Sequence, residues 1–171
     1  MEKAKENFYL FLDIDGVMWD WPWRIEEIKS GRIRKGTAIT EFNPLSVDAL
    51  NQLIAYLSTD YDCNLVISST WRACMKQTIS TLKKNGVDIP DIIDRTPMSK
   101  ASKQRGKEIE KFLSNKPNSD NLLIIDDEIS DIVKHFSPDK IIKTNMFDES
   151  LREHHIKKWI KEHSPDSELS K

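Results

Sequence analysis

The sequence predicts an α/β fold, with a central parallel sheet and helices on both of its faces. Short runs of apolar residues, typical of buried strands, alternate with segments whose apolar residues recur at helical spacing. Three of the apolar runs end in polar residues, as expected where the carboxyl ends of parallel strands carry a site. The chain has 171 residues, so we expect one domain over residues 1–163 and a polar tail at 164–171.

The first apolar run, residues 8–12, stops at two carboxylates, Asp13 and Asp15, which Gly16 follows. Carboxylates buried at the end of a strand are costly unless a positive charge compensates them. A cation that prefers oxygen ligands, such as Mg²⁺, would supply that charge. Gly16 would let the chain turn sharply and bring its backbone close to a phosphate.

Residues 18–42 come next and have an unusual composition. Trp19, Trp21 and Trp23 alternate with other residues, and a stretch rich in glycine and basic residues follows them. This pattern predicts a loop and a β-hairpin that form a flap, without a folded cap domain. Two hypotheses remain for the tryptophans, which either pack on the core or form one wall of the mouth of the site.

The middle of the chain alternates helices and strands. Asn43 and Pro44 are typical of a helix start, with a cap residue followed by proline in the first turn. The buried face of this helix is predicted to consist of Leu50, Leu53, Ile54 and Leu57. We then expect a strand over residues 64–69, a helix over 73–85 closed by Gly86, a short strand at 92–93 and a helix over 104–113.

The last part of the chain repeats the alternation. An apolar strand over residues 122–125 ends in Asp126 and Asp127. Helical turns over 129–136, a strand over 140–143 and a closing helix over 149–161 are predicted to follow. His154 and His155 in that helix are expected to pack at the surface, because no cysteine or acid lies at metal-site spacing from them.

Composition narrows the class of protein. Charged residues make up 32% and apolar residues 38% of the chain, as in a globular protein, and the net charge of −2 argues against non-specific coating of nucleic acid. No apolar stretch approaches the length of a membrane span or of a signal-peptide core. Cys63 and Cys74 form no CxxC motif, so we expect reduced thiols and a cytoplasmic protein.

The stretch Asp13-Ile14-Asp15-Gly16-Val17 resembles the first motif of the haloacid dehalogenase-like (HAD) superfamily of phosphohydrolases. The resemblance continues over nearly the whole chain and implies a three-layer, Rossmann-like fold without a large cap domain. It implies that Asp13 is a nucleophile that forms an aspartyl-phosphate and that Asp15 is the general acid and base. It also implies a Mg²⁺ ion held by the Asp13 carboxylate, the Asp15 carbonyl and an acid of a third strand.

The second and third motifs of the superfamily have several candidates. The second motif is a hydroxyl at a strand end that hydrogen-bonds the phosphoryl group, and Ser69 is favoured over its neighbours Ser68 and Thr70. The third motif is a basic residue at a helix start, where Arg105 takes the position and Lys103 and Lys107 remain alternatives.

The fourth motif is an acidic pair after a strand. Asp127 aligns with the usual metal ligand, and Asp126 is either a further ligand or the partner that orients the basic residue of the third motif. Asp131 is the later acid of the same motif.

Three segments resemble more narrowly the small phosphatase domains of bacterial RNA-repair proteins. They are Ser69-Thr70-Trp71-Arg72, Arg105-Gly106-x-Glu108-Ile109 and Ile125-Asp126-Asp127. A site without a large cap, bordered by tryptophans and basic residues, favours a phosphate-ended RNA or DNA strand as the substrate. A small-molecule phosphatase or nucleotidase, a phosphotransferase and an inactive binding protein of the same fold remain alternatives.

Overall fold

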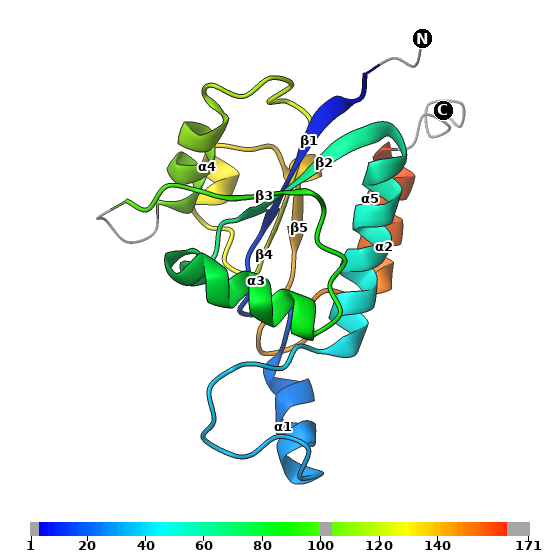
Figure 1. Cartoon of the computed structure of the whole chain (residues 1–171), viewed down its shortest axis with the longest axis vertical. Helices are drawn as coiled ribbons and strands as arrows, with labels where there is room; N and C mark the ends of the chain where they lie inside the picture. The colour runs from blue at the N-terminus through cyan, green and yellow to red at the C-terminus, as the bar shows by residue number, and fades with distance from the viewer. Residues whose placement is uncertain (1–3, 100–103, 164–171) are drawn as a thin grey trace.

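A five-stranded sheet forms the centre of the protein, whose computed structural model describes residues 4–99 and 104–163. The order of the strands is β3-β2-β1-β4-β5, and all neighbours are parallel (Figure 1). The strands are β1 (Glu6–Leu12), β2 (Tyr61–Ile67), β3 (Ile92–Arg95), β4 (Leu122–Asp126) and β5 (Ile141–Lys143). The chain moves outward from β1 through β2 to β3 and then returns to the other side of β1, so the topology switches between β1 and β4.

Helices cover both faces of the sheet, which confirms the predicted three layers. Successive residues of β1 alternate between two cores: Leu10 and Leu12 pack toward one, and Tyr9 and Phe11 toward the other. The first core is covered by α2 (Pro44–Asp60), α3 (Met75–Lys84) and α5 (Glu153–His163), and the second by α4 (Arg105–Leu113). Both faces of the sheet are therefore buried, as is usual for parallel strands.

The helix predicted after Asn43 is confirmed as α2. The Asn43 side chain accepts a hydrogen bond from the backbone N–H of Leu45 at 3.1 Å, and Pro44 occupies the first turn. All four residues predicted for its buried face are buried. Gly86 follows α3 with a φ of 84°, as expected for a residue that ends a helix.

Several predicted boundaries differ from the structure. A 3-10 turn, Thr70–Cys74, precedes α3, and the helical turns expected over 129–136 are limited to a 3-10 turn at Ile132–Lys134. Another 3-10 turn, Pro138–Lys140, leads into β5, and α5 begins at Glu153 instead of residue 149. The late start of α5 follows from its cap, because the Arg152 backbone N–H donates to Nδ1 of His155 at 3.1 Å. The predicted tail at 164–171 lies outside the described residues.

The hairpin predicted within residues 18–42 is wrong. The segment forms a helix, α1 (Trp21–Lys29), followed by an irregular loop. Asp20 caps this helix by accepting a hydrogen bond from the Trp23 N–H at 2.8 Å, and Pro22 lies in the first turn. We call residues 21–42 the α1 insert; it projects from the body of the protein beyond the end of β1 (Figure 1).

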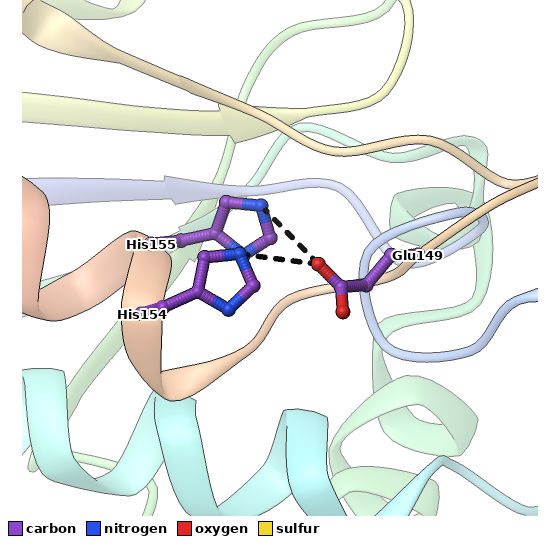
Figure 2. A group of neighbouring side chains, drawn as sticks. All are labelled: Glu149, His154 and His155. Carbon is purple, nitrogen blue, oxygen red and sulfur yellow. Dashed lines mark ion pairs between the residues drawn. The ribbon is translucent and has the colours of Figure 1, made fainter.

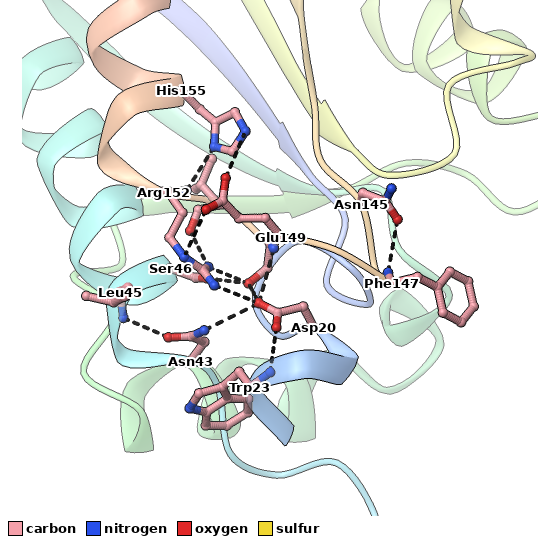
Figure 3. Close-up of polar contacts among 12 residues, drawn as sticks. Asp20, Trp23, Asn43, Leu45, Ser46, Asn145, Phe147, Glu149, Arg152 and His155 are labelled. Carbon is pink, nitrogen blue, oxygen red and sulfur yellow. Dashed lines mark hydrogen bonds and ion pairs between the residues drawn. The ribbon is translucent and has the colours of Figure 1, made fainter. Parts of the chain in front are cut away.

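A buried polar cluster around Asp20 joins the α1 insert to the start of α5 (Figure 3). Asp20 is only 1% exposed, and its Oδ2 accepts hydrogen bonds from Arg152 Nη2 at 2.8 Å and from the Ser150 N–H at 3.1 Å. The Ser150 hydroxyl donates to the same oxygen. A buried carboxylate with this many donors is compensated, so it can serve as an anchor.

Every helix within residues 4–99 and 104–163 is too short or too polar to cross a bilayer. Cys63 is buried, Cys74 is exposed, and both are free thiols.

Candidate active site

Asp13 and Asp126 lie side by side at the topological switch point. Asp13 directly follows β1 and Asp126 ends the neighbouring strand β4, and the Asp13 N–H donates to the carbonyl of Ile125 at 3.0 Å. Asp13 is 5% exposed and Asp126 is fully buried. The prediction that polar strand ends converge at one edge of the sheet is confirmed for these two acids.

Arg105, the first residue of α4, joins the two carboxylates. Its Nη1 lies 3.0 Å from Asp13 Oδ1 and 2.5 Å from Asp126 Oδ2. Lys107 is exposed on the same helix, and Lys103 lies outside the described residues. The geometry therefore favours Arg105 as the basic residue of this site, and Asp126 as the acid that orients it.

The acids carry shifted pKa values. Burial, together with the neighbouring charge of Asp126, raises the pKa of Asp13 to about 7, although Arg105 opposes the shift. Burial and the charge of Asp13 raise the pKa of Asp127 to about 6. Burial also raises the pKa of Asp126. One guanidinium therefore leaves part of the negative charge of this cluster uncompensated.

The donor set of the cluster fits a divalent cation. Asp13, Asp126 and Asp127 each offer a carboxylate oxygen, and these oxygens lie within 4.8 Å of one another. All three donors are hard oxygens, the ligand type that Mg²⁺ prefers. Asp126 already accepts from Arg105 and from the Glu128 N–H at 2.9 Å, so Asp127 has more capacity left for a cation.

Gly16 lies directly against Asp127. It has a φ of 76°, and a Cβ at this position would come within 2.5 Å of Asp127 Cγ. Both observations require glycine here, since residues with a side chain rarely adopt this backbone conformation and Asp127 fills the space that a Cβ would need. The turn after β1 and the acid after β4 are therefore shaped to fit each other.

Asp15 is held by two tryptophans. Trp19 Nε1 donates to Asp15 Oδ1 at 2.9 Å, and Trp71 Nε1 donates to Asp15 Oδ2 at 3.1 Å. Sequence reasoning did not foresee these contacts. The spacing of four residues between Asp15 and Trp19 was a weak local signal, whereas nothing local connects Asp15 with Trp71.

Ser69 lies beside the Asp13 carboxylate and donates a hydrogen bond to it through its hydroxyl. The Ser69 hydroxyl oxygen also accepts a hydrogen bond from the backbone N–H of Trp71 at 3.4 Å. The buried hydroxyl of Ser68 has no hydrogen-bond partner among the described residues. The structure therefore brings Ser69, the favoured candidate, into the acidic cluster.

A buried ion pair supports the strand end that carries Ser69. Arg72 Nη2 lies 2.6 Å from Glu108 Oε2 of α4, and Arg72 Nη1 donates to the carbonyl of Ser69 at 3.0 Å and to that of Ser68. α4 thus positions both Arg105 and, through Glu108, the hydroxyl segment after β2.

A family model described as the HAD domain in Swiss Army Knife RNA repair proteins matches residues 9–156. The chain belongs to this family. The match includes every described residue of the acidic cluster, and it agrees with the parallel sheet without a large cap. Membership places the chain in the HAD phosphohydrolase superfamily. No curated protein and no solved structure matches the chain.

A second cluster contains Glu149, His154 and His155 (Figure 2). Glu149 Oε1 lies 3.1 Å from His154 Nε2 and 4.0 Å from His155 Nε2. His155 accepts the Arg152 N–H through Nδ1, so neutral His155 carries its hydrogen on Nε2, the atom that faces Glu149. The expectation that no acid accompanies these histidines is wrong, because Glu149 lies beside both of them; the arrangement suits a helix cap with an ion pair.

Proposed function

We propose that this protein is a Mg²⁺-dependent phosphatase that works through an aspartyl-phosphate on Asp13 and acts on the phosphate-bearing end of a nucleic-acid strand. The observation that carries the proposal is the meeting of Asp13, Asp127 and Arg105 at the switch point of a chain from this family. The raised pKa values of Asp13 and Asp127 support it, because buried groups with strongly shifted pKa values cluster at functional sites.

In the first proposed step, a carboxylate oxygen of Asp13 attacks phosphorus and the bond to the leaving oxygen breaks. Asp15 gives its proton to that oxygen. In the second step, Asp15 takes a proton from water, the water oxygen attacks phosphorus, and inorganic phosphate leaves as the Asp13 carboxylate re-forms. Asp15 suits this role because both of its oxygens are held in place by the indole N–H groups.

The other residues act on charge and position. Arg105 and the Ser69 hydroxyl are placed to donate hydrogen bonds to the phosphoryl oxygens, since both already contact Asp13. The proposed Mg²⁺ ligands are the Asp13 and Asp127 carboxylates and the Asp15 carbonyl, with Asp126 holding Arg105. When bound, the cation neutralises the repulsion between the carboxylate nucleophile and the phosphate.

Two features support a nucleic-acid end as the substrate. The family description names RNA-repair proteins. The α1 insert, at the end of β1 that leads into the site, exposes Trp21 and carries basic residues that include Arg34 and Lys35. Aromatic rings stack on unpaired bases and basic residues follow a phosphate backbone. A cytoplasmic location, in keeping with the free thiols, is part of the proposal.

The test is phosphate release from an oligonucleotide with a terminal phosphate and from the matching mononucleotide, with Mg²⁺ and with a chelator. We expect hydrolysis that needs Mg²⁺, and a higher kcat/KM on the oligonucleotide that falls as salt rises. Equal kcat/KM values without salt dependence would instead indicate a small-molecule phosphatase. Tight binding without hydrolysis of any phosphate ester would indicate an inactive binding protein.

A further inference from the structure

A cavity of about 540 Å³ lies inside the α1 insert, between α1 and the loop that follows it. Its walls are formed largely by the apolar side chains of Trp21, Ile25, Ile28 and Ile39. Trp21 is 38% and Ile25 is 45% exposed, so two large apolar side chains of α1 are accessible at this cavity. The volume falls in the range of roughly 300–1,000 Å³ that small-molecule sites occupy.

Arg24 lines the cavity and carries one unsatisfied donor. This arginine is only 4% exposed, and its Nη2 donates to the carbonyl of Thr37 at 2.9 Å. Its Nη1 is buried and has no hydrogen-bond partner among the described residues. An unpaired N–H of a buried guanidinium is costly, and an acceptor atom of a ligand in the cavity would remove that cost.

The charge at the cavity is positive. Lys29 and Lys35 line it beside Arg24, and none of the described residues that line it is acidic. Lys29 is paired with Glu26 at 2.7 Å, which leaves Lys35 as the exposed positive charge at the rim. An anionic ligand with an apolar, flat part and a hydrogen-bond acceptor matches these walls in charge and polarity.

One indole ring separates the cavity wall from the acidic site. Trp21 packs edge-to-face against Trp19, with ring centroids 5.4 Å apart, and Trp19 donates to Asp15. The Arg24 guanidinium lies over the same Trp19 ring, at 5.9 Å from its centroid. A chain that extends from a phosphate at Asp13 therefore has a short path to the cavity.

We propose that this cavity binds a nucleobase of the single strand whose terminal phosphate lies at Asp13, an inference that rests on the proposed function. The base packs against Trp21 and the isoleucines, and a carbonyl or ring nitrogen of the base accepts from Arg24 Nη1. Lys35 contacts a phosphate of the backbone. The α1 insert is thus the part of the protein that distinguishes a nucleic-acid end from a simple phosphate ester.

The test compares Ile25→Glu with Ile92→Glu. Both isoleucines are similarly exposed, at 45% and 47%, but Ile92 begins the edge strand β3, outside the α1 insert and its cavity. Glutamate is compatible with an exposed helix position, so Ile25→Glu is expected to fold. For each variant, kcat/KM is measured on a short single strand with a terminal phosphate and on glycerol phosphate, which has no base.

The ratio of the two kcat/KM values is expected to fall about tenfold in Ile25→Glu, because base stacking contributes roughly 1–3 kcal/mol. In Ile92→Glu the ratio should be that of the unchanged protein. An unchanged ratio in Ile25→Glu would overturn the proposal. The proposal would also be overturned if the unchanged protein is a dimer and Ile25→Glu is a monomer, since a second copy of the chain would then occupy the cavity.

A binding measurement separates this inference from the proposed function. Fluorescence anisotropy is followed with a labelled single strand that lacks the terminal phosphate. Weaker binding to Ile25→Glu than to Ile92→Glu supports a base in the cavity even if no phosphate ester is hydrolysed. Equal binding to both variants would contradict it even if the protein proves to be a phosphatase.

Discussion

Asp15 lies between two indole N–H donors. Trp19 and Trp71 each donate an indole N–H to one of its two oxygens, which restricts rotation of the carboxyl group. Proton transfer requires the acid within hydrogen-bond reach of the leaving oxygen. The two tryptophans are therefore positioning residues for the proposed acid and base.

Trp71→Phe should lower kcat about tenfold with little change in KM, because a small misplacement of a catalytic group has a large effect on rate. Phenylalanine keeps an aromatic ring to pack against Phe42, whose ring centroid lies 5.9 Å from that of Trp71. Steady-state kinetics measure the effect. Trp23→Phe is the control, because the Trp23 indole N–H makes no hydrogen bond among the described residues. Equal kcat values for Trp71→Phe and Trp23→Phe would contradict a positioning role for Trp71.

The acidic cluster makes the effect of the metal dependent on pH. The pKa values of Asp13 and Asp127, about 7 and about 6, lie above the ordinary value of 3.8. Between pH 3.8 and the raised pKa values, the folded state therefore binds more protons than the unfolded state. Stability of the metal-free protein should therefore decrease as pH rises through this window. Since Mg²⁺ binds the deprotonated acids, we expect Mg²⁺ to raise Tm more above pH 7 than below pH 6.

Asp127→Ala should remove most of this Mg²⁺-dependent rise in Tm, because it deletes a proposed ligand. Asp131→Ala is the matched control, since Asp131 Oδ2 accepts from the Gly106 N–H at 2.9 Å and supports the start of α4. Thermal unfolding with and without Mg²⁺ measures both. If Mg²⁺ raises the Tm of Asp127→Ala as much as that of the unchanged protein, Asp126 is the ligand instead.

At the scale of elements, α1 was the main error of the sequence analysis. The glycines, basic residues and alternating tryptophans of residues 18–42 indicated a loop and hairpin, and this pattern was given more weight than the signal for a helix. That signal was present, since Asp20 followed by Pro22 is a cap residue with proline in the first turn. The strands that carry the site were predictable because each is an apolar run with a polar end.

The packing between elements was not predictable in the same way. The contact of Trp71 with Asp15 and the pair of Arg72 with Glu108 join residues 56 and 36 positions apart. Such contacts depend on the placement of whole elements, and one sequence carries no local pattern for them. The acids and Arg105, by contrast, follow strand ends or begin a helix, so their convergence follows from the topology.

Asp20 links α1 to the body of the protein, so its replacement has a predictable cost. Asp20→Ala should destabilise the protein by about 3 kcal/mol, because it removes the cap of α1 and leaves Arg152 without its buried partner. Urea unfolding measures the change. Glu149→Gln, at a half-buried position 3.9 Å from Arg152, should change stability by less than about 0.5 kcal/mol. Similar losses in both variants would contradict the anchoring role.

At the scale of the whole molecule, the strand order determines where chemistry takes place. Because the topology switches between β1 and β4, the chain leaves these neighbouring strands in different directions, and Asp13 and Asp126 meet at their carboxyl ends. The α1 insert projects beyond the end of β1 and borders this region without forming a large cap (Figure 1). The fold thus combines a buried acidic site with an adjacent aromatic and basic surface.

The central claim is that Asp13 becomes phosphorylated during turnover. The direct measurement uses an oligonucleotide that carries a radioactive terminal phosphate, with Mg²⁺ and an acid quench in the first turnover. The unchanged protein should retain covalent label that hydroxylamine removes, as expected of an acyl phosphate, and Asp13→Asn should retain none and release no phosphate. Phosphate release by Asp13→Asn at the rate of the unchanged protein would contradict the account.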